Sequence, residues 1–439
     1  MCVLGEKMLK SLIICSIAVL LMITSIIVKP YVVIKKFKFG LYSIIVLFFA
    51  IMCLALNALP FNVAIQGITQ NTPVNPLKIL ALFISLSLIS VYLGDSGFFT
   101  MIAQKLFEKN NGSVFKLFLT LYIVVSVLTL FTSNDIIILT FTPLICIFCE
   151  NAKISPVPFL FGEFISANTL SMGFIIGNPT NLYLAGSNYI TFFEYFKVMF
   201  VPTLVSGTLC FFALVLIFRK QLFGVKMQTS LEHKIVPVRK AQMLASLSAL
   251  ILTIIALSIS DILGVESYLI CVVVFLLLTI TLIVIELIEH KSITGVLHSL
   301  KKAPYELIPF VLSMFILVLS LEYSGITTIL GEKLITGSKL DALSFGFLSS
   351  LSANLLNNIP MSVLFEKIIN GGSVYALYGS IIGSNIGAFI TPVGALAGIM
   401  WTKILASFNV KISFRKFISY GALPALVALV SSVLVLLII

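Results

Sequence analysis

The sequence predicts an all-α polytopic membrane protein with two inverted repeats, about ten transmembrane spans, two re-entrant hairpins and interrupted helices at the membrane midplane. Apolar residues make up 59% of the 439 residues, and charged residues make up only 10%. Soluble globular domains carry far more charge, so this composition indicates a membrane protein. One helical crossing needs about 20 apolar residues, which leaves room for about ten crossings. No polar stretch is long enough to form a separate soluble catalytic domain.

Ten apolar runs are expected to cross the membrane. The first run, 9–28, follows Lys7 and Lys10 and so resembles a signal peptide in its flanking charge. It is long, it lacks a small-residue cleavage site and four lysines follow it, so we expect it to be retained as a span. The other nine spans are expected at 40–59, 78–94, 157–188, 197–218, 241–259, 268–287, 304–323, 374–402 and 418–439.

Two further apolar stretches, 115–149 and 342–368, carry polar residues at their middle: TSND at 132–135 and ANLLNNIP at 353–360. The distribution of basic residues predicts that both are re-entrant hairpins, which enter and leave on one side of the membrane. Six loops then share one face and hold 21 of the 28 Lys and Arg residues: 29–38, 105–116, 150–153, 219–240, 286–302 and 403–416. Basic loops favour the cytoplasm, so we expect this face, with its long 219–240 loop, to be cytoplasmic.

The net charge of +11 could suggest a nucleic-acid partner. Here, however, the basic residues lie in short loops between apolar runs, as the topology of a membrane protein predicts. The seven cysteines lie mostly within apolar runs and are expected to pack as small hydrophobic residues. This includes Cys146 and Cys149, whose CxxC spacing alone is weak evidence for a metal site. We therefore expect a lipid bilayer around the chain, and neither nucleic acid nor metal as a ligand.

With this topology the chain divides into a first repeat at 1–218, a cytoplasmic linker at 219–240 and a second repeat at 241–439. Each repeat has three spans, a hairpin, an interrupted span and a final span. The first repeat begins outside and the second inside, so the two are inverted. Internal matches support the division: Ser96-Gly97 with Ser324-Gly325, Asn134 with Asn358, and Asn168 with Asn385. Inverted repeats that meet at the membrane midplane are typical of secondary transporters.

Two polar, glycine-containing segments interrupt apolar spans at equivalent places in the repeats: SANTLSMGFIIGNPTN at 166–181 and GSNIGAFITPVGALAG at 383–398. In lipid, an interrupted helix is tolerated only where protein or a water-filled cavity satisfies the exposed backbone. A pair of such interruptions in two repeats points to the binding site of a transporter. The residues expected to break the helices are Gly177, Asn178, Pro179, Pro392 and Gly394.

The two hairpin tips and the two interrupted segments are expected to converge, which gives a candidate substrate site rich in amides and hydroxyls. These groups both donate and accept hydrogen bonds, so the site suits a hydroxylated or oxyanionic solute. Alternatively, the same side chains only cap broken helices or bridge packed ones. The candidate substrate-binding residues are Ser133, Asn134, Asn168, Thr169, Asn357, Asn358, Ser384, Asn385 and Thr391.

Two acidic residues near this site are candidates for binding a coupling ion. Asp135 follows the first hairpin tip and precedes the apolar run IIILTF. An ionisable group at membrane depth indicates function, and a carboxylate can take up a proton or bind sodium. Alternatively, Asp135 caps the second arm of the hairpin. Glu163, five residues before Asn168, is a second buried acid and a candidate relay partner.

The segments TSNDIIILTFTPLI, SANTLSMGFIIGNPTNLYLA, LSANLLNNIPMSVL and GSNIGAFITPVGALAGIMW resemble the ion transporter superfamily. Within it they are most similar to the branch of arsenite/antimonite permeases and sodium/proton antiporters, which shares a domain type with citrate and dicarboxylate carriers. The resemblance implies a scaffold, a transport domain built from the hairpins and broken helices, elevator-like movement and a homodimer. It also allows a separate ATPase subunit that docks on the cytoplasmic loops.

The expected function is secondary active transport of a small inorganic anion or metalloid, with arsenite or antimonite efflux across the plasma membrane as the first hypothesis. The alternatives are a sodium- or proton-coupled carrier of citrate, dicarboxylates or similar organic anions, and a sodium/proton antiporter. The four motifs contain neither Lys nor Arg, and TSND and LNNIP stand where sodium-coupled dicarboxylate carriers have Ser-Asn-Thr. Both observations favour the first hypothesis. The chain has no GxxxxGK[ST] phosphate loop and no catalytic constellation, so we expect a gradient-driven protein that is not an enzyme and needs no cofactor beyond coupling H⁺ or Na⁺.

Overall fold

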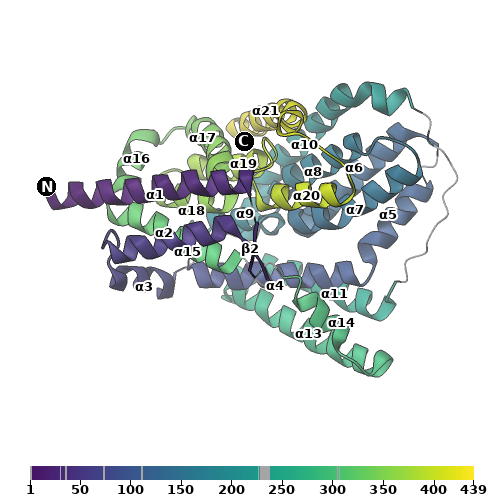
Figure 1. Cartoon of the computed structure of the whole chain (residues 1–439), viewed down its shortest axis with the longest axis horizontal. Coiled ribbons are helices and arrows are strands. Elements are labelled where there is room, and N and C mark those ends of the chain that lie inside the picture. Colours follow the sequence, from purple (N-terminus) through teal and green to yellow (C-terminus); the bar gives the residue numbers. More distant parts are fainter. Residues whose placement is uncertain are drawn as a thin grey trace.

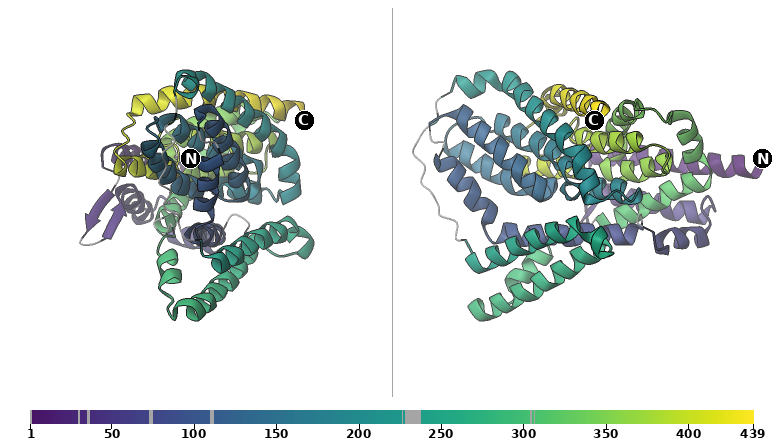
Figure 2. Two further views of the ribbon diagram at one scale, coloured as in Figure 1. Left: turned by 90° about the vertical axis from the view of Figure 1, so that its right-hand side faces the viewer. Right: turned by 180° about the vertical axis from the view of Figure 1, so that it is seen from behind.

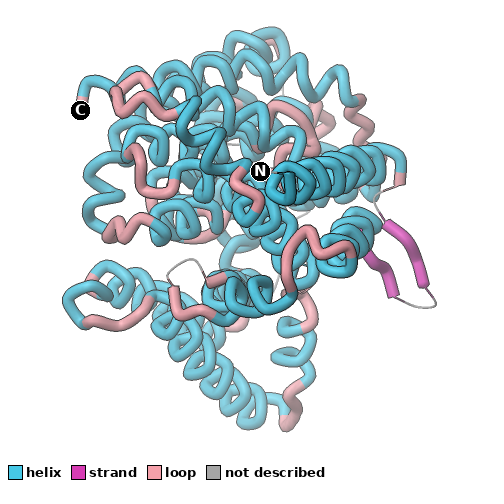
Figure 3. Tube along the Cα trace, turned by 90° about the vertical axis from the view of Figure 1, so that its left-hand side faces the viewer, coloured by secondary structure: helices cyan, strands magenta, loops and turns pink. Residues whose placement is uncertain are grey.

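The computed structural model describes residues 2–29, 31–34, 37–72, 75–109, 112–225, 227, 238–303, 305 and 307–439. Nearly all of this part of the chain is helical, which confirms the predicted fold class (Figure 1). The exception is a small antiparallel hairpin of β1 (Tyr31–Ile34) and β2 (Phe37–Gly40), in which Tyr31 pairs with Gly40. This hairpin lies at the edge of the molecule, in the loop expected at 29–38 (Figure 3).

The first part of the chain contains helices α1 to α10 and two short 3-10 helices. Their ends follow from local sequence. Asn75 caps α4 by accepting hydrogen bonds from the N–H groups of Leu77 and Lys78, and Thr191 and Glu194 form a capping box at the start of α10. The helices are α1 (Cys2–Val28), α2 (Leu41–Ala55), α3 (Phe61–Thr69), α4 (Pro76–Asp95), α5 (Phe98–Lys109), α6 (Val114–Phe131), α7 (Asn134–Asn151), α8 (Val157–Leu170), η1 (Ser171–Gly173), η2 (Ile175–Gly177), α9 (Pro179–Ser187) and α10 (Phe192–Phe223).

The second part of the chain contains helices α11 to α21 in a corresponding order. They are α11 (Lys240–Ser258), α12 (Ser260–Leu263), α13 (Ser267–His290), α14 (Thr294–Leu300), α15 (Leu307–Tyr323), α16 (Ile326–Leu334), α17 (Asp341–Leu356), α18 (Asn358–Ile369), α19 (Val374–Gly387), α20 (Leu396–Ser407) and α21 (Phe414–Ile438).

Within the described residues, eight helices are long and apolar enough to cross a membrane, or nine if the pair α15 and α16, bent by 74°, counts as one span. Six of the eight coincide with predicted spans, and the other two are α6 and α7, the arms of the first predicted hairpin. Three other predicted spans are shorter or divided: α2 has 15 residues, and the runs 157–188 and 374–402 are each split into shorter helices. The exact number of crossings therefore stays a prediction.

The helices pack in two groups. The first, which we name the framework, comprises α1, α2, α4, α11, α13, α14 and α15. Its packing is repeated in the two halves. Helix α2 packs between α1 and α15, and its counterpart α13 packs between α11 and α4. Figure 2 shows α11 and α13 along one edge of the molecule, on the opposite side from α21.

The second group, the inner bundle, comprises α6 to α10 and α17 to α21. Here α8 packs on α6 and α7 as α19 packs on α17 and α18, and α10 packs along α21. The short helices α5 and α16 connect the groups in matched ways, because α5 contacts α4 and α7 while α16 contacts α15 and α18. The repeat boundaries at 218 and 241 stay a prediction, since residues 226 and 228–237 of the linker lie outside the described residues.

Candidate functional site

Both predicted helix breaks are present, and each needs its glycine. Helix α8 ends at Leu170, and the chain passes through η1 and η2 before α9 begins; α19 ends at Gly387, and α20 begins at Leu396. A Cβ atom on Gly177 would lie 2.2 Å from the carbonyl oxygen of Ser171, and one on Gly394 would lie 2.4 Å from that of Gly387. The returning backbone therefore passes against the end of the helix that it has just left, and only glycine leaves room for it.

The other predicted break residues also lie at these interruptions. The side chain of Asn178 caps α9 by accepting a hydrogen bond from the N–H of Thr180 at 3.2 Å, and Pro179 is the first residue of that helix. This is the position where proline costs no helical hydrogen bond. Pro392 lies in the non-helical segment between α19 and α20.

The two hairpin tips are equally clear. Only Thr132 and Ser133 separate α6 from α7, and only Asn357 separates α17 from α18. Each tip contacts the broken segment of its own half of the chain. The Nδ2 of Asn134 donates to the Oδ1 of Asn168 at 2.9 Å, whereas the second tip is held by its backbone, with the N–H of Asn358 donating to the carbonyl of Gly394 at 3.0 Å. The structure thus brings tips and breaks together, as the sequence predicts.

Asn168 and Asn385 occupy matched positions, and both are fully buried. In each, Nδ2 donates to the carbonyl four residues earlier, that of Phe164 at 2.7 Å and that of Ile381 at 2.8 Å. Their other contacts differ. Asn168 accepts from Asn134 in its own half, whereas the amide of Asn385 reaches across to the first half.

Three side chains of the first half surround Asn385. Its Oδ1 lies 2.9 Å from the Oγ of Ser171 and 2.9 Å from the Nδ2 of Asn178, and its Nδ2 donates to the Oδ1 of Asn181 at 2.7 Å. Neither Ser171 nor Asn181 is among the predicted site residues. Both lie in the SANTLSMGFIIGNPTN segment, where their polar character within an apolar span is a signal that sequence reasoning could have used.

The remaining predicted substrate residues differ in their surroundings. The hydroxyls of Thr169 and Ser384 are buried, and among the described residues they have no hydrogen-bond partner. The Oγ of Ser133 lies 3.5 Å from the Oδ1 of Asn134, at the limit of a hydrogen bond. Thr391 donates to the Oδ1 of Asn354 at 2.6 Å.

Asn354 and Asn357 support the second break from the second hairpin. Asn354, which sequence reasoning did not select, donates to the carbonyl of Gly387 at 3.0 Å, the last residue of α19. Asn357 has φ 75° and ψ 153°, a strained backbone conformation that residues other than glycine rarely adopt, and its Nδ2 lies 3.4 Å from the carbonyl of Val393. Amide side chains therefore satisfy carbonyl groups that the interruption leaves without a helical partner.

The two acidic residues lie in different surroundings. Asp135 is half-buried in the first turn of α7, and its carboxylate makes no hydrogen bond or ion pair within the described part of the chain. A helix N-terminus favours a negative charge there. Glu163 is fully buried on α8, where both carboxyl oxygens lie near the hydroxyl of Thr142, at 2.9 and 3.0 Å. Thr142 is seven residues beyond Asp135 on α7, which corresponds to about 10 Å along the helix, so the two acids do not form a directly connected pair.

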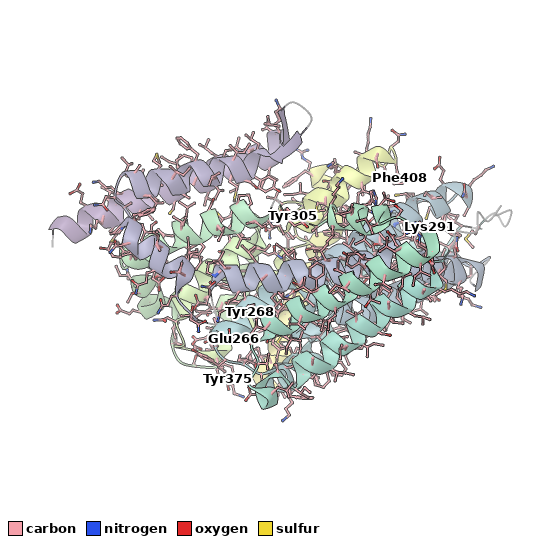
Figure 4. All side chains as sticks on the ribbon, turned by 90° about the horizontal axis from the view of Figure 1, so that it is seen from below. Glu266, Tyr268, Lys291, Tyr305, Tyr375 and Phe408 are labelled. Atoms are coloured by element: carbon pink, nitrogen blue, oxygen red, sulfur yellow. The ribbon has the colours of Figure 1, made fainter. Side chains whose placement is uncertain are left out.

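A cavity of about 550 Å³ separates the framework from the inner bundle. Its framework wall includes Lys78 on α4 and Tyr268 on α13, and its bundle wall includes Gly186 and Phe192. Lys78 pairs with Glu266, and its ammonium lies 5.3 Å from the centre of the Tyr268 ring. Figure 4 shows Glu266 and Tyr268 at one end of α13 and Lys291 at the other.

None of the predicted substrate residues lines this large cavity. A smaller apolar pocket of about 30 Å³ lies nearer to the site, between α4 and α15 on one side and α9 and α18 on the other. It shares Ile79 with the large cavity and reaches Ile359, which follows the tip residue Asn358. The six cysteines whose side chains the structure describes are buried and form no disulfide, Cys146 and Cys149 among them.

Comparison with known proteins gives several relatives with transport-related names. The chain is 26% identical over 360 residues to the "Arsenical pump membrane protein" of Yersinia enterocolitica, a match that covers 79% of this chain and 82% of the relative. It is 25% identical over 362 residues to the "Putative arsenical pump membrane protein" of Bacillus subtilis, covering 75% and 80% of the two chains.

The fold resembles that of a solved transporter. The YdaH transporter of Alcanivorax borkumensis superimposes with a TM-score of 0.57 over 98% of each chain, at 14% sequence identity, which supports similarity of fold alone. The family profile described as citrate transporter, CitMHS, matches residues 2–373. This confirms the resemblance seen in the sequence motifs, and the chain therefore belongs to the CitMHS citrate transporter family of multi-pass membrane transporters.

Proposed function

We propose that this transporter exports arsenite or antimonite across the plasma membrane as a secondary active transporter. The observation that carries the proposal is the chemistry of the site: buried amides and hydroxyls converge from both hairpin tips and both breaks, and the four motifs contain no Lys or Arg. Arsenous acid is uncharged at neutral pH and has three hydroxyl groups, so amides that donate and accept hydrogen bonds suit it without a basic clamp. The relatives named as arsenical pump membrane proteins support the same substrate.

Movement of the inner bundle against the framework would expose the site to each side in turn. Two features support this elevator-type mechanism. The hairpins and broken helices all belong to the inner bundle, and the contacts of α5 and α16 link the two groups at matched places. In the orientation that the basic loops predict, the 219–240 loop is cytoplasmic.

Asp135 is the proposed site of coupling to a proton or sodium gradient. Its carboxylate is half-buried, lies next to the tip residue Asn134 and has no partner in the described part of the chain, so it is free to take up a proton or a cation. No cofactor is needed for this scheme. A homodimer is a further part of the proposal, supported by the resemblance of the motifs alone. The same resemblance allows a separate ATPase subunit on the cytoplasmic loops, which would drive transport in place of the gradient.

A second candidate function is coupled transport of citrate or another organic anion, or sodium/proton antiport. The family description favours it, since the matched profile is that of a citrate transporter. A di- or tricarboxylate would then have its charge met by helix N-termini and coupling cations, because the motifs contain no basic residue.

Arsenite export can be tested in cells that lack their own metalloid efflux. The intact chain is expected to raise arsenite tolerance and lower arsenite accumulation, and Asn134→Ala with Asn168→Ala is expected to abolish both effects. Ser380→Ala is the matched control: this buried hydroxyl on α19 donates only to the carbonyl of Ala376 in its own helix. No gain in tolerance from correctly inserted protein would contradict arsenite export. Sodium-dependent uptake of labelled citrate would establish the second function instead.

A further inference from the structure

We propose that Asn385 is a positioning residue, which joins the broken segments of the two halves into one rigid unit, rather than a contact of the transported solute. It is the matched counterpart of Asn168, and the symmetry of the two motifs alone would give both the same role. The hydrogen bonds of the two residues differ in a way that separates the roles. The effect on transport rests on the proposed function, whereas the structural role does not.

The side-chain amide of Asn385 has four polar neighbours, and all four are protein groups. Its two N–H groups are directed at the Oδ1 of Asn181 (2.7 Å) and the carbonyl of Ile381 (2.8 Å). Its Oδ1 receives the Nδ2 of Asn178 at 2.9 Å and has the hydroxyl of Ser171 at the same distance. A side-chain amide has two donors and can accept two hydrogen bonds, so both donors are used and both acceptor positions face protein groups. The single hydroxyl proton of Ser171 is shared between this oxygen and the carbonyl of Asn168, which lies 2.8 Å from the same hydroxyl. A solute would have to displace one of these protein groups.

The partners of Asn385 fix the orientation of its amide. The Oδ1 of Asn178 accepts from the N–H of Thr180 at the start of α9, so its Nδ2 is the group that faces Asn385. The Nδ2 of Asn181 lies 2.9 Å from the carbonyl of Ser171 and 3.2 Å from that of Phe174, so its Oδ1 is the group that accepts from Asn385. These bonds form a chain that runs from Asn178 through Asn385 to Asn181 and ends on the backbone of the first break.

This chain of amides occurs only once in the two motifs. With the offset of 217 that relates Asn168 to Asn385, the positions matched to Ser171, Asn178 and Asn181 are Ala388, Ala395 and Gly398. None of these three has a side chain that could bond to Asn168. Asn168 accepts instead from the hairpin residue Asn134, and its second acceptor site has no side-chain donor within the described residues. Asn168 therefore keeps unused hydrogen-bonding capacity, which a solute could use once movement of the bundle exposes this buried side chain, whereas the Asn385 side holds the two halves together.

The hydrogen-bonded group formed by Asn385 and its three partners is buried next to the proposed solute site, so the loss of one of its bonds should disturb that site. Asn385, Ser171, Asn178 and Asn181 are each at most 1% exposed, so a lost bond leaves a buried polar group unsatisfied. Because Asn181 also holds the carbonyls of Ser171 and Phe174, Asn385 fixes the path of the break that directly follows Asn168. The backbone on one side of the solute site is thereby oriented from the opposite half of the chain.

The decisive variant is Asn385→Asp, which keeps the size of the side chain and replaces both N–H donors with an acceptor. Oxygen would then face the Oδ1 of Asn181 and the carbonyl of Ile381. We expect the apparent unfolding temperature of the purified protein to fall by several degrees and the maximal transport rate to fall at least tenfold, with KM changed less than threefold. Ser380→Ala, one turn earlier on the same buried helix, is expected to change neither quantity. A large rise in KM with unchanged thermal stability would overturn the proposal and restore Asn385 as a solute contact.

A second variant covers the case in which Asn385→Asp does not fold. Asn178→Ser keeps an oxygen that can cap α9 but lacks the amide that donates to Asn385. It should lower the unfolding temperature less than Asn385→Asp. Asn385→Ala combined with Asn181→Ala should cost less stability than the sum of the two single changes, because the two residues share one hydrogen bond. Strictly additive costs would contradict a shared unit. Thermal unfolding needs no substrate, so these measurements remain decisive even if arsenite is not transported.

Discussion

At the scale of single residues, one chemical difference between the two halves is the acidic side chain of Asp135, which has an apolar counterpart in the second half. The matched residue of the second half is Ile359, which lines an apolar pocket, whereas Asp135 places a carboxylate without a partner among the described residues beside the first tip. This carboxylate accepts no hydrogen bond from the N–H groups in the first turn of α7, which supports the proposed coupling role rather than a capping role. Its position still benefits from the partial positive charge of the helix N-terminus.

Asp135→Asn is therefore expected to lower gradient-driven transport about tenfold, the equivalent of about 1.4 kcal/mol, while insertion and folding persist. Asparagine keeps the size of the side chain but can neither take up a proton nor carry charge. Transport measured in vesicles with imposed pH or sodium gradients would show the loss. Glu150→Gln, at the exposed far end of the same helix, is the control and should behave as wild type. Unchanged pH and sodium dependence in Asp135→Asn would leave Asp135 with a helix-stabilising role only.

The break residues could be predicted from the sequence because glycine, proline and asparagine within an apolar span usually mark an interruption of the helix. It could not distinguish Asn168 from Asn385, since both follow from the same repeated pattern. The distinction depends on Ser171, Asn178 and Asn181, which become neighbours of Asn385 only when residues more than 200 positions apart meet. Asn354 was missed for a similar reason, because its role depends on the distant carbonyl of Gly387.

At the scale of structural elements, the two breaks depend on close backbone approach. Gly177→Ala and Gly394→Ala would each place a methyl group against a carbonyl oxygen, at 2.2 and 2.4 Å respectively. Overpacking of this kind costs about 1–3 kcal/mol or more, so we expect a lower yield of folded protein and a lower unfolding temperature. Gly186→Ala on α9 is the matched control, because nothing lies within 4 Å of the added atom. Normal stability of both break variants would show that the backbone can move away without cost.

The two hairpins are held differently at their tips, which predicts different responses to mutation. The first tip depends on the side-chain bond from Asn134 to Asn168, whereas the second keeps a backbone bond from Asn358 to Gly394. We expect Asn134→Ala to increase hydrogen–deuterium exchange at residues 131–136. Asn358→Ala keeps the backbone N–H that donates to Gly394 and should change exchange at residues 355–360 much less, and equal increases at both tips would contradict the difference.

The secondary structure was predictable in kind but not in every boundary. Apolar length and basic loops identified six spans that are single long helices, because a continuous apolar run has one stable form in lipid. The same reasoning did not anticipate the β1–β2 hairpin in the loop expected at 29–38, nor the sharp bend between α15 and α16. The bend falls at Ser324 and Gly325, where Gly325 has a positive φ of 80°. The sequence match of this pair with Ser96-Gly97, where Gly97 also has a positive φ, was the available signal for it.

At the scale of the whole molecule, an elevator-type cycle requires that contacts between the framework and the inner bundle break and re-form. One such contact is the ion pair between Glu322 at the end of framework helix α15 and Lys367 on bundle helix α18, at 3.4 Å. Lys367 also lies 3.6 Å from the carboxylate of Glu366 on its own helix. By contrast, Asp95 and Lys302 form an ion pair at 2.5 Å between α4 and the end of α14, entirely within the framework.

These two ion pairs provide a test of relative movement. Cysteines in place of Glu322 and Lys367, joined by a short bifunctional thiol reagent, are expected to reduce transport to a small fraction of its rate, because the link holds the bundle in one position. Cysteines in place of Asp95 and Lys302, joined in the same way, should leave the rate nearly unchanged, since α4 and α14 move together. Each single-cysteine variant treated with the reagent controls for modification alone, and a reducible reagent should allow the rate to recover. Full activity with residues 322 and 367 linked would mean that α15 and α18 keep their contact throughout the cycle, and the solute would then have to reach both sides by opening of the hairpin tips rather than by movement of the whole bundle.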